Sequence, residues 1–150
     1  MATKIRQGAA QLYDRDFVRW TEEQASAMRD GRLEAMDLDN LAEEIESLGK
    51  RDRRRLKSRL TILIVHLLKW RWQPDHRSGS WESTIRTQRD DIQQLLDDSP
   101  SLRRDVAAFT RERYVMARRN AAAETGLPLD MFPENCPFAV DEILSEEWLP

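Results

Sequence analysis

The chain has few of the residues that build covalently stapled or metal-centred folds. It contains one cysteine, Cys136, so an intrachain disulfide and a zinc site made of several cysteines are both excluded. Two histidines among 150 residues leave few nitrogen ligands for a metal ion. A single thiol fits a reducing compartment, and we expect the protein to be cytoplasmic.

Long apolar runs are also missing. The longest, Leu60 to Leu68, is interrupted by Thr61 and His66 and is far shorter than the roughly 20 residues that a membrane-spanning helix needs. No apolar stretch follows the basic residues near the N-terminus, so we expect no secretory signal. The sequence therefore predicts no membrane association, and it places residues 60–68 in a core helix.

Neither sign of charge dominates. With 24 lysines and arginines against 27 aspartates and glutamates, the formal net charge is -3, so the whole chain has no field that attracts nucleic acid or anionic lipid. Hydrophobic residues make up 40% of the chain, which is too much for a disordered protein. A chain of this length has the usual size of one domain, and we expect a single domain over residues 1–150.

Apolar residues recur at helical spacing almost throughout, while the alternation typical of strands is absent. This pattern predicts an all-α, single-domain bundle of about five helices, followed by an irregular C-terminal segment and a short terminal helix. The expected helices cover residues 17–30, 37–48, 50–72, 80–98 and 101–125, and the short one lies near 140–145.

Capping residues mark the expected helix ends. Asp14 or Asp16 is expected to cap the first helix, and Ser80 the fourth. Glycine readily adopts the left-handed conformation at a helix C-terminus, so three helices are expected to end at Gly31, Gly49 and Gly126. The apolar stripes of the first two helices are expected to face the core: Phe17, Trp20, Gln24 and Met28, then Leu38, Leu41, Ile45 and Leu48.

Polar side chains interrupt these inward faces at five positions: Gln24, Glu44, His66, Arg89 and Tyr114. An isolated buried charge costs several kcal/mol, so the simplest arrangement is mutual contact of Glu44, His66 and Arg89, with Gln24 or Tyr114 nearby. We favour a structural network that fixes the helix register. A catalytic or ligand-binding cluster of the same residues is the alternative.

A metal site is not favoured. Carboxylate metal sites in helix bundles repeat a Glu-x-x-His unit, and neither histidine stands at that spacing from a glutamate. Glu44 and His66, with Asp37 or His76, form a weak alternative zinc site. Phosphate-binding loops, dinucleotide fingerprints and hydrolase nucleophile motifs are absent, so the sequence indicates no particular cofactor.

Seven basic residues occur in the ten positions from Lys50 to Arg59. Such a helix face can contact phosphates, and the candidates for nucleic-acid binding are Arg51, Arg54, Arg55, Lys57 and Arg59. Charged helix faces are common, and acidic residues at 43, 44 and 46 precede this segment, so we favour a solvated or acid-paired face over nucleic-acid binding.

Several segments together resemble a known family over about residues 12–150. They are Tyr13-Asp14-Arg15-Asp16-Phe17, the run from Asp37 to Gly49, His66-Leu67-Leu68-Lys69-Trp70, Ser99-Pro100-Ser101-Leu102, and Phe132-Pro133 to Cys136-Pro137. The chain resembles the bacterial family catalogued as domain of unknown function 29, which is common in cyanobacteria. The resemblance implies a small, uncharacterised helical protein without an established activity.

An interaction or structural module is the function that we favour from the sequence, with a second copy or another protein as the partner. The alternatives are a small enzyme or metal-dependent module using Glu44, His66 and Arg89, and a nucleic-acid-associated protein using residues 50–59.

Overall fold

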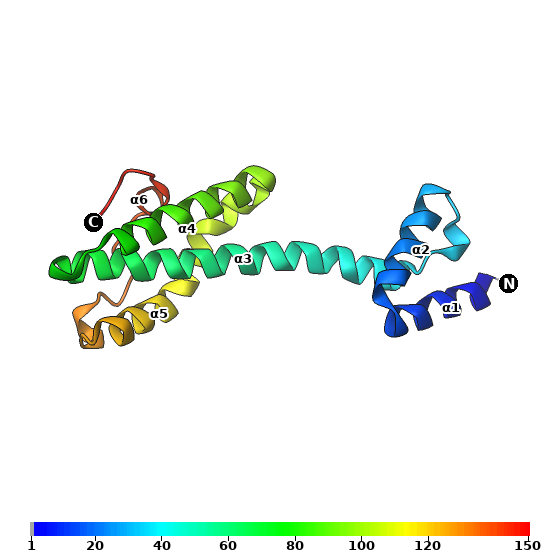
Figure 1. The fold of residues 1–150 in the computed structure, drawn as a ribbon, viewed down its shortest axis with the longest axis horizontal. Coiled ribbons are helices and arrows are strands. Elements are labelled where there is room, and N and C mark those ends of the chain that lie inside the picture. The colour runs from blue at the N-terminus through cyan, green and yellow to red at the C-terminus, as the bar shows by residue number, and fades with distance from the viewer. Residues whose placement is uncertain (1) are drawn as a thin grey trace. The chain divides into compact units, whose positions relative to one another are not determined.

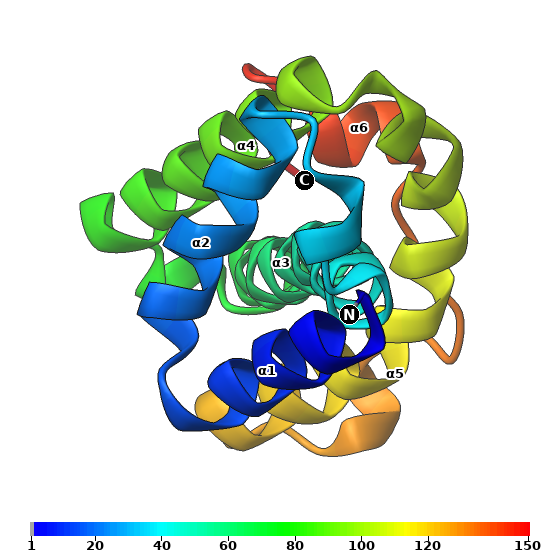
Figure 2. The same cartoon turned by 90° about the vertical axis from the view of Figure 1, so that its right-hand side faces the viewer.

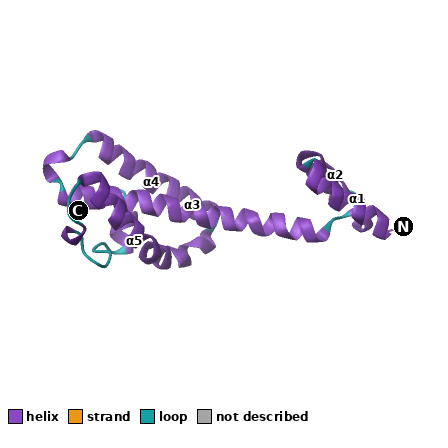
Figure 3. Cartoon of the chain, turned by 90° about the horizontal axis from the view of Figure 1, so that it is seen from below, coloured by secondary structure: helices purple, strands orange, loops and turns teal. Residues whose placement is uncertain are grey.

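The computed structural model describes the backbone of residues 2–150 and the side chains from residue 8 onward. Within this range the chain consists of helices joined by loops and turns, with no strand (Figure 3). The predicted all-α class is therefore confirmed. Nowhere in the described part of the chain is a helix both long and apolar enough to cross a lipid bilayer.

The α-helices follow one another along the chain with short 3-10 turns between most of them. They are α1 (Ala2–Arg15), α2 (Phe17–Arg29), α3 (Leu38–Trp72), α4 (Gly79–Asp98), α5 (Val106–Thr125) and α6 (Val140–Leu144). The 3-10 turns are η1 (Leu33–Ala35), η2 (Pro74–His76), η3 (Pro100–Asp105) and η4 (Leu129–Met131). The contacts divide the chain into two compact units, residues 1–51 and 52–150.

In the second unit, α4 and α5 run alongside α3 (Figure 1), and the end-on view shows α4, α5 and α6 around it (Figure 2). Leu56, Leu60, Leu63 and Leu67 follow one side of α3 at helical spacing, and all four are fully buried. Other faces of this part of α3 are buried too, through Ile64, Val65 and Leu68. The prediction of a core helix over residues 60–68 is confirmed.

The first unit comprises α1, α2, η1 and the start of α3, and its core is small. Trp20 and Ala27 are its only buried hydrophobic side chains among the described residues 8–51. The Trp20 ring contacts the edge of Tyr13, with 4.9 Å between centroids, and stacks with Phe17 at 5.7 Å. Aromatic contacts at these distances contribute about 0.5–1.5 kcal/mol each beyond the buried area.

Several predicted helix ends are confirmed. The Asp16 carboxylate accepts a hydrogen bond from the Arg19 backbone N–H at 3.0 Å and caps α2. Gly31 follows α2 with a φ of 66°, and Gly126 ends α5 with a φ of 71°. A positive φ strains any side chain with a Cβ atom, so both positions favour glycine.

Other predicted boundaries are wrong. α3 does not end at Gly49 but continues to Trp72, because one glycine inside a helix costs only about 1 kcal/mol relative to alanine. Ser78, and not Ser80, caps α4 by accepting a hydrogen bond from Trp81 at 3.3 Å. The predicted fifth helix begins with the 3-10 turn η3 before α5 starts at Val106. α1 has no counterpart in the prediction.

Candidate functional site

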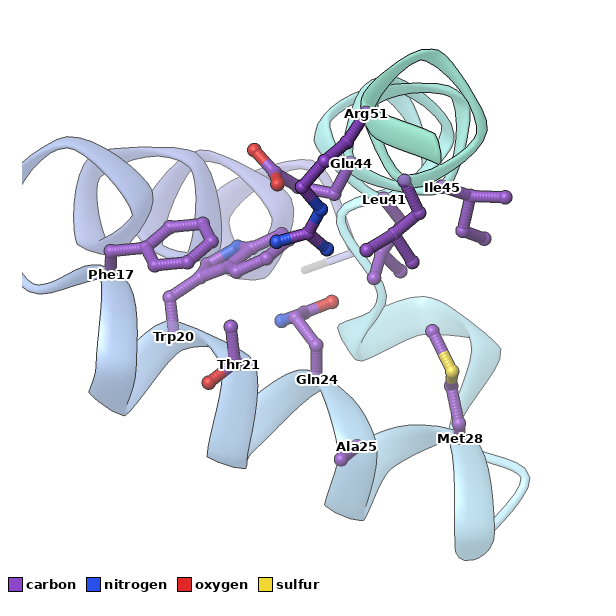
Figure 4. Close-up of a pocket in the computed structure, with 11 residues that line it drawn as sticks. Phe17, Trp20, Thr21, Gln24, Ala25, Met28, Leu41, Glu44, Ile45 and Arg51 are labelled. Carbon is purple, nitrogen blue, oxygen red and sulfur yellow. The ribbon is translucent and has the colours of Figure 1, made fainter. Parts of the chain in front are cut away.

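A groove lies within the first unit, between α2 and the start of α3 (Figure 4). Its volume is about 480 Å³. Apolar side chains dominate its lining, which consists of Phe17, Trp20, Thr21, Gln24, Ala25, Met28, Leu41, Glu44, Ile45, Leu48 and Arg51. The groove is therefore suited to an apolar surface and offers few groups for chemistry.

Helical periodicity explains the two walls of the groove. Side chains at positions 17, 20, 24 and 28 share one face of α2, and those at 41, 45 and 48 share one face of α3. These are the stripes that the sequence predicted to face the core. That prediction is wrong for five of the eight stripe residues, which are exposed by 42% or more. The exposed fractions are 46% for Phe17, 42% for Met28, 52% for Leu38, 64% for Ile45 and 53% for Leu48.

Hydrogen bonds at the groove floor fix the loop between α2 and α3. The Gln24 side-chain oxygen accepts from the Asp37 backbone N–H at 2.7 Å, and its amide group donates to the Ala35 carbonyl at 3.4 Å. The Asp37 carboxylate accepts from the Trp20 indole at 3.3 Å and from the Asn40 amide at 2.7 Å. Gln24 and Asp37 thus fasten the loop between α2 and α3 to both helices.

Glu44 lies on the α3 wall and is half-buried. Its carboxylate accepts a hydrogen bond from the Tyr13 hydroxyl at 2.6 Å, which ties the end of α1 to α3. This hydrogen bond, with a smaller contribution from desolvation, raises the pKa of Tyr13 to about 12. Tyr13 therefore remains a neutral donor throughout the ordinary pH range.

His66 belongs to the second unit and is half-buried there. Its Nδ1 atom lies 2.9 Å from the carbonyl oxygen of Ile62, one turn earlier in α3. Desolvation by burial is the main cause that lowers the pKa of His66. A neutral ring whose Nδ1–H donates to this carbonyl satisfies the geometry.

Arg89 is buried in the second unit and binds backbone instead of a carboxylate. Its Nε donates to the Ile143 carbonyl at 2.9 Å, and its Nη2 donates to the Glu142 carbonyl at 3.2 Å. Both carbonyls belong to α6, so the guanidinium fastens this short helix to α4. The Tyr114 hydroxyl similarly donates to the Pro133 carbonyl at 2.6 Å, and burial raises its pKa to about 12.

The structure does not bring the five polar side chains into one cluster. Gln24 and Glu44 have partners in the first unit, whereas His66, Arg89 and Tyr114 each have a backbone partner in the second. The expectation that Glu44, His66 and Arg89 form hydrogen bonds with one another is corrected. Glu44 is hydrogen-bonded to Tyr13, and His66 and Arg89 are hydrogen-bonded to backbone carbonyls. A catalytic role for any of these residues stays a prediction.

The weak zinc alternative gains no support. Over the described residues, no three histidine, cysteine, aspartate or glutamate side chains are grouped so that they could hold a metal ion. Glu44 and Asp37 are hydrogen-bonded in the first unit, and His76 is exposed in η2 of the second.

Part of the basic segment of α3 is paired with acids, the arrangement that we favoured from the sequence. Lys57 Nζ lies 2.8 Å from the Glu112 carboxylate, and Arg59 lies 3.2 Å from that of Asp91. These two acids come from α5 and α4, far away in the sequence, and Glu46, one of the neighbouring acids that we considered, lies 3.7 Å from Lys50. Arg51, Arg54 and Arg55 are exposed, and nucleic-acid binding through this segment stays a prediction.

Lys69 is a buried charge that sequence reasoning missed. Its side chain is 8% exposed, its Nζ donates to the Glu124 carboxylate at 2.8 Å, and it lies 4.6 Å from the centroid of the Trp81 ring. One feature of the sequence indicates that Lys69 is buried: it directly follows the apolar run that ends at Leu68.

Comparison with known proteins gives a family but no described relative. No curated protein and no solved structure matches the chain. The family model described as domain of unknown function DUF29 matches residues 12–149 and so spans parts of both units. The predicted resemblance is confirmed, and the chain belongs to the DUF29 family, whose function is not characterised.

Proposed function

We propose that this protein is a protein–protein interaction module of the bacterial cytoplasm and that the groove of the first unit is its docking surface. The observation that carries the proposal is an apolar groove of about 480 Å³ whose walls are left partly exposed. Exposed apolar patches of this kind mark surfaces that another protein covers.

The small core of the first unit supports this function. A segment of about 50 residues buries too little of its surface to be more than marginally stable alone. Fully burying an isoleucine or leucine contributes about 1.5–3 kcal/mol, so covering the exposed halves of Ile45 and Leu48 contributes about 1 kcal/mol each. Docking therefore stabilises the unit and the complex together.

The alternative functions have less support. An enzyme of the kind considered would need Glu44, His66 and Arg89 to converge, but each is hydrogen-bonded to a different part of the chain. Arg89 lines a second cavity, of about 300 Å³, with Glu82, Arg86, Glu146 and Glu147, but neither Glu44 nor His66 lines it. A nucleic-acid surface is supported only by Arg51, Arg54 and Arg55, which are exposed, because acids from neighbouring helices offset the charges of Lys57 and Arg59.

Photocrosslinking in the native host tests the proposal. A photoreactive amino acid in place of Ile45 is expected to give a covalent adduct with a protein partner, identified by mass spectrometry. The matched control places the same amino acid at Glu43, which lies about 160° around the helix from Ile45 and faces away from the groove. An Ile45 adduct that disappears in the Leu48→Glu variant supports the module, and the lack of any intermolecular adduct at Ile45 refutes it.

A further inference from the structure

The occupant of the groove can be specified further, and this step rests on the proposed function. We infer that the occupant is a second copy of the chain: the start of α3 from one copy lies in the groove of the other, with the two helices antiparallel about a two-fold axis. Each copy then both donates a helix and receives one.

The first unit has both halves of such an interface on one face. The groove supplies the receiving half. The inserting half is a ridge on α3 formed by Leu38, Ile45 and Leu48, which are 52%, 64% and 53% exposed. A two-fold interface brings the same patch of both copies together, so it requires a groove and a ridge side by side.

The apolar side chains define a register. Leu38, Leu41, Ile45 and Leu48 are spaced three and four residues apart, which is the pattern of the contact seam between paired helices. In an antiparallel pair, Ile45 of each copy can lie opposite Leu48 of the other. This arrangement gives two equivalent apolar layers on either side of the two-fold axis.

The charges of Glu44 and Arg51 favour this register and the antiparallel direction. Glu44 and Arg51 both line the α3 wall, seven residues or two turns apart, and Arg51 extends over the groove (Figure 4). When Ile45 lies opposite Leu48 in an antiparallel pair, Glu44 of each copy and Arg51 of the other lie on the same flank of the seam, offset by about 3 Å along the helix axis, which long side chains can span. In a parallel pair these two positions lie on opposite flanks of the seam, beside positions such as Gly49 of the other copy, so Glu44 and Arg51 find no opposite charge there.

Neighbouring charges on α3 provide a matched control. Glu43 and Lys50 have the same seven-residue spacing but lie about 100° around the helix from Glu44 and Arg51, on the side away from Ile45 and Leu48, and both are exposed. Lys50 lies 3.7 Å from Glu46 within its own helix. Reversing these two charges changes the protein as much as reversing Glu44 and Arg51, yet it leaves the proposed interface untouched.

Sedimentation equilibrium of the purified full chain tests the inference. The wild-type protein is expected to be a dimer. Glu44→Arg alone and Arg51→Glu alone are each expected to raise the dimer Kd at least tenfold, because every dimer then contains two like-charged pairs. An equimolar mixture of the two variants is expected to recover dimers, since each heterodimer contains two attractive pairs.

The controls separate pairing from folding. Glu43→Arg, Lys50→Glu and their mixture are expected to keep the wild-type Kd. Tyr13→Phe, which removes the hydrogen bond to Glu44 but no charge, is also expected to dimerise. Leu48→Glu changes an exposed side chain, so it should keep the helical content measured by circular dichroism while losing the dimer.

A monomeric wild-type chain at 100 µM, or variants that stay monomeric when mixed, would overturn the second-copy occupant. In that case, photocrosslinking tests whether the protein is an interaction module for a different partner. If Ile45 forms an adduct with a different protein, the interaction module stands and only the self-pairing fails. If Ile45 reacts only within its own chain, both fail.

Discussion

The two units use the same helical pattern with different results. In the second unit, α4, α5 and α6 cover the apolar faces of α3, and one core cluster extends from Leu56 to Ile143. In the first unit the comparable stripes of α2 and α3 remain partly exposed. Of the eleven large hydrophobic side chains that are exposed among residues 8–150, seven belong to the first unit, which has about a third of the chain.

The difference shows that an amphipathic stripe specifies a face to be covered but not what covers it. The second unit contains enough helices to close its own core. The first unit has only α1 and α2 to pack with the start of α3, so the remaining apolar surface is available to another molecule.

Two matched leucines of α3 give the largest expected contrast. Leu63→Ala removes a fully buried side chain and is expected to lower the free energy of unfolding by about 2–5 kcal/mol, because a cavity remains in a closed core. Leu48→Ala changes a side chain that is 53% exposed and is expected to cost less than about 1 kcal/mol. Urea unfolding measures both values.

The protein concentration matters in this comparison. It must lie below the dimer Kd, because association stabilises the folded state and would add a loss of pairing to the Leu48→Ala result. Equal losses for the two variants would show that the first unit is as tightly packed as the second, and the contrast between them would disappear.

Local signals in the sequence predicted much of the fold. Asp16 and Gly126 mark helix ends because capping and a positive φ depend on residues within one turn. The prediction that a helix ends at Gly49 was wrong because glycine is also tolerated inside a helix. Its role depends on whether the residues that follow can continue the helix, and in α3 they do.

The candidate site was predicted less well than the fold. The position of a residue in a helix tells which way its side chain points, but not which side chains of other elements lie within reach of it. Glu44 and Arg89 were predicted to lie on the inward faces of their helices; Arg89 is buried and Glu44 is half-buried, but their partners come from elements far along the chain. The Tyr13 hydroxyl is 31 positions from Glu44, and the Ile143 carbonyl is 54 positions from Arg89. A sequence pattern cannot identify which backbone carbonyl will accept a hydrogen bond, since every residue has one.

Arg89→Met tests how the second unit closes its core. The substitution keeps much of the apolar stem but removes both hydrogen bonds to α6, leaving two carbonyls of a partly buried helix without their charged donors. We expect a loss of about 1–3 kcal/mol in the free energy of unfolding. Amide hydrogen exchange is expected to become faster in α6 and to stay unchanged in α2.

Arg86 supplies the control for that variant. It lies one turn earlier on α4 and forms only an exposed ion pair with Glu82 at 3.5 Å. Exposed pairs of this kind contribute at most about 0.5 kcal/mol, so Arg86→Met should leave both the stability and the exchange of α6 nearly unchanged. A similar loss for both variants would mean that Arg89 does not fasten α6.

Acid titration gives the smallest expected effect, and it should be confined to the second unit because both histidines lie there. Burial lowers the pKa of His66 below its ordinary value of about 6.5. At a pH between the lowered pKa of His66 in the folded chain and its ordinary pKa in the unfolded chain, the unfolded chain binds a proton that the folded chain does not bind. Stability is therefore expected to fall as the pH decreases from 7 to 5, and His66→Gln should flatten this slope. A slope that survives in His66→Gln would assign it to carboxylates and leave His66 without a part in the pH response.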